Sequence, residues 1–213
     1  MIVRLGGSDS IRTSPSPEQD AGFELFEGDW VAPNGKGKTS DLQINLTLQS
    51  ENDVDGAVKA EIRFGNEEDG LLPIMELSAP ESLLRYPKSA PEDGYDIKVV
   101  RPPYSTPVYG AKVEAAEPVG YFFRIRTRRD ASTGKILSAF YGKITAASEL
   151  HRPSDNPFRL HLYSYNKLGG RFVPRPGVEF CYNLNPNSKD QNLEYDQRTN
   201  LAREADEGTV YAP

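Results

Sequence analysis

The densest group of potential metal-ligating side chains lies between residues 183 and 196. Four oxygen-bearing residues alternate there with other types: Asp190, Asn192, Glu194 and Asp196. An extended backbone would place all four on one side, and calcium takes about six to eight oxygen ligands of this kind. Asn and Asp also form Asx turns, in which the side chain bonds to the nearby backbone. Two interpretations follow: a loop stabilised by Asx turns, or a calcium site.

A second group combines aromatic rings with polar donors along a predicted strand, 158–165. Every second residue belongs to it: Arg159, His161, Tyr163 and Tyr165. If Phe158, Leu160 and Leu162 point inward, these four residues point outward in a row. Aromatic rings stack on the C–H faces of sugars, while Arg and His donate hydrogen bonds to hydroxyl groups. The row predicts a carbohydrate-binding surface; the alternative is an outer sheet face on which the tyrosines simply pack.

The third group is a run of arginines, Arg124, Arg126, Arg128 and Arg129. The first three would share one face of a strand, and a ladder of guanidinium groups can bind carboxylate or phosphate. Arg124 and Arg126 are therefore candidate ligand-binding residues. The alternative is pairing with the glutamates of neighbouring strands.

Other catalytic patterns fail on spacing or context. Residues 32–39 fit a relaxed phosphate-loop pattern, but a predicted strand follows where a helix N-terminus is needed. His151 and His161 lack the spacing of zinc ligands, and no Gly-x-Ser-x-Gly motif is present. We predict no catalytic residue. A hydrolase built on two converging carboxylates stays an alternative, because the fold determines which carboxylates meet.

Composition excludes several classes of protein. The 213 residues carry a net charge of −6, which argues against a nucleic-acid partner. The single cysteine, Cys181, excludes an intrachain disulfide. No run of about eighteen apolar residues could span a membrane, and residues 1–7 contain no apolar signal region.

Short segments with alternating apolar residues indicate the elements that must position these groups. The predicted strands cover 42–48, 58–64, 121–127, 135–145, 158–165 and 178–184. The only helix candidate is 79–86, with Pro and Glu near its start.

This pattern predicts a mostly-β fold, a single antiparallel β-sandwich of jelly-roll type with long loops and at most one or two short helices. We expect a flexible N-terminal arm over 1–20, the β-sandwich domain over 21–196 and a C-terminal tail over 197–213, because both ends are polar.

Three motifs in the last third resemble a segment of uncharacterised bacterial proteins, many of them large or exported. They are the sequence YGKI at 141–144, the NLNP that ends an aromatic strand at 183–186, and DQNLEYD at 190–196. The resemblance covers residues 141–201 and brings no activity with it. It implies that residues 185–196 form a fixed structural unit, and it favours an extracytoplasmic location.

Together these features favour a non-enzymatic binding or interaction module, with a carbohydrate or a protein as its partner and calcium as the one candidate cofactor. A structural subunit of a cell-surface or particle assembly is the first alternative, because polar ends can be ordered by neighbouring subunits. The carboxylate-based hydrolase is the second.

Overall fold

The computed structural model describes residues 2–4, 12–13, 20–48, 58–77, 86–96, 98–104, 118–145, 157–166 and 172–194. All regular elements in these ranges are strands, so the mostly-β prediction is confirmed. Of the helix candidate 79–86, only Tyr86 falls within them, in a bend.

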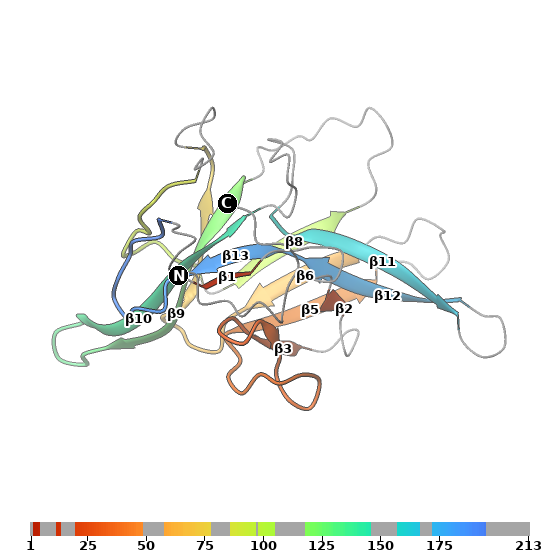
Figure 1. Cartoon of the computed structure of the whole chain (residues 1–213), viewed down its shortest axis with the longest axis horizontal. Coiled ribbons are helices and arrows are strands. Elements are labelled where there is room, and N and C mark those ends of the chain that lie inside the picture. The colour runs from red at the N-terminus through yellow and green to blue at the C-terminus, as the bar shows by residue number, and fades with distance from the viewer. Residues whose placement is uncertain are drawn as a thin grey trace.

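The strands are β1 (Ile2–Arg4), β2 (Arg12–Thr13), β3 (Ala21–Glu24), β4 (Asp29–Trp30), β5 (Leu42–Leu48), β6 (Val58–Arg63), β7 (Gly70–Ile74), β8 (Lys98–Tyr104), β9 (Gly120–Arg129), β10 (Ile136–Thr145), β11 (Arg159–Asn166), β12 (Phe172–Glu179) and β13 (Cys181–Leu184). They form three antiparallel sheets (Figure 1). Sheet A has the order β1-β13-β10-β9-β7, sheet B the order β11-β12-β2, and sheet C the order β4-β3-β5-β6-β8.

Alternating apolar residues account for most of the strands that the sequence predicts, but the predicted strand 178–184 is divided at Phe180 between β12 and β13. The segment 42–48 forms β5, and its Leu42, Ile44 and Leu46 have no exposed surface (0%). β5 pairs with β6 from Gln43↔Arg63 to Leu48↔Val58, as expected of two strands joined by a short connection. Strands also form at 120–129, 136–145 and 159–166, where alternation predicts them.

Two strands that alternation does not predict contain proline and lie at sheet edges. Pro73 is in β7, the last strand of sheet A, and Pro102 and Pro103 are in β8, the last strand of sheet C. Proline has no N–H to donate, so a strand that contains it is tolerated where one side needs no partner.

Two short parts of the expected N-terminal arm belong to the sheets. Residues 2–4 pair with β13 as β1, and residues 12–13 pair with β12 as β2. The segment 1–20 therefore contains two strands that extend sheets A and B.

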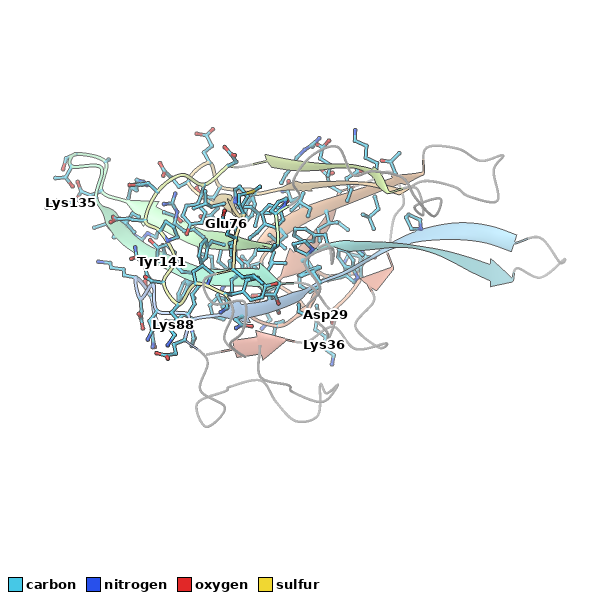
Figure 2. The ribbon with its side chains drawn as sticks, turned by 90° about the horizontal axis from the view of Figure 1, so that it is seen from above. Asp29, Lys36, Glu76, Lys88, Lys135 and Tyr141 are labelled. Carbon is cyan, nitrogen blue, oxygen red and sulfur yellow. The ribbon has the colours of Figure 1, made fainter. Side chains whose placement is uncertain are left out.

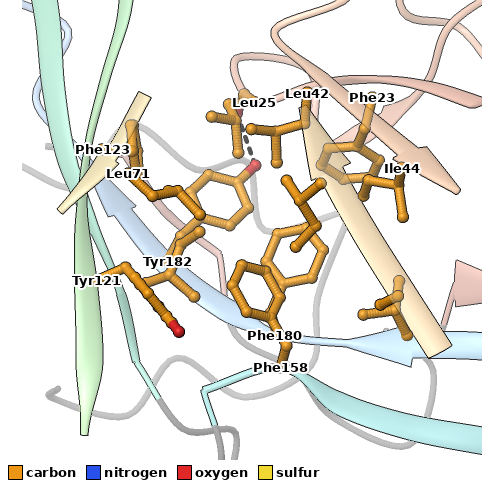
Figure 3. Close-up of a cluster of buried hydrophobic side chains, with 14 of the residues drawn as sticks. Phe23, Leu25, Leu42, Ile44, Leu71, Tyr121, Phe123, Phe158, Phe180 and Tyr182 are labelled. Carbon is orange, nitrogen blue, oxygen red and sulfur yellow. Dashed lines mark hydrogen bonds between the residues drawn. The ribbon is translucent and has the colours of Figure 1, made fainter. Parts of the chain in front are cut away.

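The main hydrophobic cluster (Figure 3) draws most of its residues from sheets A and C, and Val178 on β12 adds one from sheet B. Phe23, Leu42 and Ile44 come from sheet C, and Phe123 and Tyr182 come from sheet A. The hydroxyl group of Tyr182 donates a hydrogen bond to the carbonyl oxygen of Leu25 at 2.6 Å, so its polar atom is satisfied inside this core.

A second cluster covers the opposite face of sheet A. Its buried members are Ile74, Tyr86, Ala90, Phe122, Ala139, Tyr141 and Leu193. The covering segments 86–90 and 191–193 are joined by hydrogen bonds from Leu193 N to Lys88 O and from Ala90 N to Gln191 O. Figure 2 shows Lys88 and Tyr141 on this part of the molecule. Sheet A is therefore buried on both faces, a condition that exposes few of its side chains to water.

Candidate functional site

The predicted carbohydrate-binding row lies on β11, which is extended over Arg159–Asn166. Its register with β12 places Arg159 opposite Glu179, His161 opposite Gly177, Tyr163 opposite Arg175 and Tyr165 opposite Val173. The side chains of these residues lie outside the part of the chain that the structure describes. Only the backbone requirement of the prediction, an extended strand, is met.

The arginine ladder predicted for β9 is interrupted by a bulge. Arg126 has a positive φ of 53°, and between the pairs Ile125↔Phe140 and Arg128↔Ser138 two residues of β9 oppose one of β10. The carboxylate of Asp69 accepts the N–H groups of Arg126 at 2.8 Å and of Thr127 at 2.9 Å, which stabilises the bulge. The prediction that Arg124, Arg126 and Arg128 share one face is wrong, because the bulge reverses the alternation.

Arg124 lies on the face of the second cluster, with 4% of its surface exposed. Its guanidinium donates to the carbonyl oxygens of Glu68 and Glu92 and lies 4.7 Å from the ring centroid of Tyr95. The nearest carboxylate oxygens, of Asp93 and Glu68, are 3.9 and 4.0 Å from its nitrogens. These contacts engage its donors within the chain.

Arg126 lies on the other side of sheet A, facing sheet C. Its Nε and Nη2 donate to Asp41 at 2.7 and 3.1 Å, and its Nη2 donates to Glu24 at 2.7 Å. The ring of Phe26 lies 4.5 Å from the guanidinium carbon. We call Glu24, Asp41 and Arg126 the inter-sheet triad, because it joins β9 to sheet C.

The two carboxylates of the inter-sheet triad have opposite pKa shifts. Burial raises the pKa of Asp41, and the hydrogen bonds from Arg126 and from Leu25 N–H offset this only in part. Burial acts on Glu24 in the same sense, but the N–H groups of Lys38 and Thr39 and the Arg126 guanidinium outweigh it and lower the pKa of Glu24. Every oxygen of the pair accepts a hydrogen bond from this chain. The inter-sheet triad therefore links β9 to sheet C, and a donor of this chain engages each of its carboxylate oxygens.

The loop that fits a phosphate-binding pattern, 32–39, uses its N–H groups internally. Lys38 and Thr39 donate to the Glu24 carboxylate, and Lys36 donates to Asp29 at 3.0 Å. Carboxylates of the chain thus occupy the donors that a phosphate would need, and β5 follows, as the sequence predicts.

The candidate calcium segment forms a series of Asx turns. Asp190 accepts the N–H of Asn192, Asn192 accepts that of Glu194, and Asn185 accepts that of Asn187, each at 2.9 Å. The carboxylate of Glu194 pairs with Lys88 at 2.7 Å. Asp196 lies outside the described residues. Within the described ranges, no three His, Cys, Asp or Glu side chains come together as a metal site would require.

A polar group that the sequence analysis misses lies on the face of the second cluster. Lys143 on β10 and Asn183 on β13 are direct cross-strand partners, with exposed fractions of 4% and 1%. The Lys143 ammonium lies 5.8 Å from the ring centroid of Tyr86, and burial lowers its pKa to about 8. Cys181, two residues before Asn183, is also buried.

The signal that could have found Lys143 is its place in the sequence Tyr141-Gly142-Lys143-Ile144. A lysine in an otherwise apolar strand is exposed to water only where no other segment covers its face of the sheet. Phe122 and Tyr141 on the same face of sheet A have aromatic side chains, which are buried when another segment packs over them. Alternation alone assigns Lys143 to solvent.

Comparison with known proteins gives no relative from which a role could be transferred. Neither the protein-family models, nor the curated proteins, nor the solved structures include a match to this chain. No helix that is long and apolar enough to cross a membrane occurs in the described ranges.

Proposed function

We propose that this chain is a non-catalytic binding module whose ligand is a carbohydrate, and that β11 carries the binding surface. The observation that supports the proposal is the regular strand over Arg159–Asn166, in which Arg159, His161, Tyr163 and Tyr165 occupy alternate positions. Alternate residues of a strand share a face, and their spacing of about 6.5–7 Å suits successive contacts along a sugar chain.

Two further features support β11 as the place of binding. Gly177 of β12 lies directly opposite His161 and has no side chain of its own. In Figures 1 and 2 the distal part of the β11–β12 ribbon extends beyond the neighbouring strands. Arg124 and Arg126 are engaged within the chain, so the proposal depends on the four β11 residues.

The wider architecture that we propose is a β-sandwich of jelly-roll type. Its support is the main cluster, which sheets A and C share. In such an arrangement, sheet B would extend one end of the sandwich and present β11 to a ligand.

A polysaccharide titration of the wild type and of Tyr163→Ala/Tyr165→Ala tests the carbohydrate proposal. Ring contacts contribute on the order of 0.5–1.5 kcal/mol each, so we expect the double variant to lose about tenfold in affinity. Ser164→Ala, between the two tyrosines, is the matched control and should bind as the wild type does. Unchanged binding by the double variant, or no glycan bound by the wild type across a glycan array, would remove the proposal.

A further inference from the structure

Lys143 and Asn183 place two buried hydrogen-bond donors side by side on sheet A. Residues that face each other directly in an antiparallel pair have Cβ atoms about 4.5–5.5 Å apart and share one face. Lys143↔Asn183 is such a pair, and Phe122 flanks Lys143 on its other side. Gly142 precedes the lysine, and the ring of Phe123 fills the space that a side chain there would need. The register of the pair is therefore fixed by packing.

Both donors lack an acceptor among the described residues. Asn183 Nδ2 is buried and has no hydrogen-bond partner. Lys143 forms no ion pair with any described carboxylate, and its described polar contact is the ring of Tyr86. The Tyr86 hydroxyl donates to Val119 O at 3.0 Å, and the described contact of the ammonium with Tyr86 is made through the ring. A buried ammonium without an acceptor is costly, so the site is complementary to a group that the chain does not itself provide.

The charge and the surroundings select the kind of group. One ammonium and one neutral amide compensate a single negative charge, whereas a phosphate dianion would leave one charge buried and uncompensated. A carboxylate has two oxygens, one for each donor. Phe122, directly opposite Lys143 on β9, is apolar and belongs to the second cluster, which suits a hydrocarbon group attached to that carboxylate.

We propose that Lys143 and Asn183 bind the carboxylate of a small apolar acid, with its hydrocarbon part against the second cluster. The site lies on sheet A and is separate from the β11 surface. It does not depend on the carbohydrate proposal, and either proposal can fail without the other.

Calorimetric titration with hexanoate tests this site, with hexan-1-ol as the uncharged control ligand. We expect hexanoate to bind the wild type and hexan-1-ol to bind at least tenfold more weakly. Lys143→Met removes the charge at similar volume and should weaken hexanoate binding at least tenfold. Lys135→Met, at the exposed tip of the β9–β10 hairpin (Figure 2), should leave it unchanged.

Asn183→Asp provides a second and independent test. An aspartate at this position would give Lys143 a carboxylate from within the chain, so this variant should fold and should no longer bind hexanoate. Hexanoate binding that survives in both Lys143→Met and Asn183→Asp would overturn the proposal. Failure of both hexanoate and benzoate to bind the wild type at millimolar concentration would also overturn it.

One intrachain source of carboxylate must be distinguished from a ligand. Glu81 lies in the sequence between Leu77 and Tyr86, which both pack in the second cluster. If Glu81→Gln gains hexanoate binding that the wild type lacks, the glutamate is the acceptor and the ligand proposal is wrong. If wild type and Glu81→Gln bind hexanoate equally, the carboxylate comes from outside the chain, as proposed.

Discussion

Arg126 and Lys143 are cations on neighbouring strands of sheet A, and they lie on its opposite faces. Arg126 faces sheet C, where Glu24 and Asp41 accept all of the described hydrogen bonds of its guanidinium group. Lys143 faces the second cluster, where the described residues offer an aromatic ring and a second donor. Sheet A thus carries one cation, Arg126, whose charge is compensated by carboxylates of the chain, and another, Lys143, for which the described residues provide no carboxylate.

This difference distinguishes a cation that stabilises the fold, Arg126, from a cation that is available to a ligand, Lys143. A charge whose partners are all within the chain contributes to the fold and has little left for a ligand. A buried charge without a partner costs stability, and such a cost is typical of sites that receive something from outside. The following four experiments test this contrast, from the largest expected effect to the smallest.

Arg126→Met should cause the largest loss of stability. It removes the cation and leaves two buried carboxylates, whose exposed side-chain fractions are 8% and 1%. Removal of one partner from a buried ion pair costs about 3–5 kcal/mol. Urea denaturation measures the loss. Arg128→Met, on the exposed end of β9, should change stability by less than about 0.5 kcal/mol, and an equal effect of both substitutions would contradict the assignment of the inter-sheet triad.

Lys143→Met should increase the free energy of unfolding, whereas Arg126→Met should decrease it. Burial lowers the pKa of Lys143 to about 8, whereas a lysine in the unfolded chain has a pKa of about 10.4. Between these values the unfolded state binds more protons, so stability rises with pH from about 8 to about 10. The cost of the buried ammonium is present in full below pH 8, and we expect the variant to be about 2–3 kcal/mol more stable than the wild type at pH 7.

The stabilities of the wild type and of Lys143→Met must be compared with each other at each pH. Burial also raises the pKa of Tyr95, so ionisation of tyrosine in the unfolded chain lowers the stability of both proteins above about pH 10. Urea denaturation at pH 7 and at pH 9.5 should show the advantage of the variant shrinking. An advantage that is the same at both values, or a variant less stable than the wild type, would mean that Lys143 has an acceptor.

Asn185→Ala should destabilise the Asx-turn segment. The Asn185 amide donates to Asp190 O at 3.2 Å and to Asn192 O at 2.7 Å, and its oxygen accepts from Asn187 N. These part-buried hydrogen bonds would be lost, and each contributes about 0.5–1.5 kcal/mol. Hydrogen exchange of the backbone N–H groups between 187 and 193 should accelerate. Ser188→Ala, which is exposed, is the control, and equal exchange in both variants would argue against the turns as the stabilising element.

Lys88→Met should have the smallest effect. Its ion pair with Glu194 is exposed, with side-chain fractions of 59% and 49%. Such pairs contribute about 0–1 kcal/mol and are screened by salt. A thermal melt should shift by no more than a few degrees. A loss comparable with that of Arg126→Met would show that exposure does not separate the two kinds of pair.

The sequence predicts β5 and β6 of sheet C and β9 and β10 of sheet A because their alternation is regular. It does not predict β8, because Pro102 and Pro103 argue against a strand, and β8 forms at the edge of sheet C. The bulge at Arg126 is also unpredictable, since it depends on Asp69, which lies 57 positions away in the chain. The inter-sheet triad follows from that bulge.

The Asx turns are predictable, because they depend on neighbouring residues and local backbone geometry. The environment of Lys143 cannot be predicted from the sequence in this way. Alternation gives the two faces of a strand but does not say what covers the second face, and here the segments 86–90 and 191–193 cover it. For the β11 row, the predicted strand is confirmed, and its ligand stays a prediction.

The most direct test of the contrast is the pKa of Lys143, measured by NMR on protein labelled with ¹³Cε-lysine, with Lys143→Met to assign the resonance. The account predicts a midpoint near pH 8 in the free protein and a higher midpoint once hexanoate is added. A midpoint at or above about 10.4, the value of an exposed lysine, would show that the ammonium is already compensated.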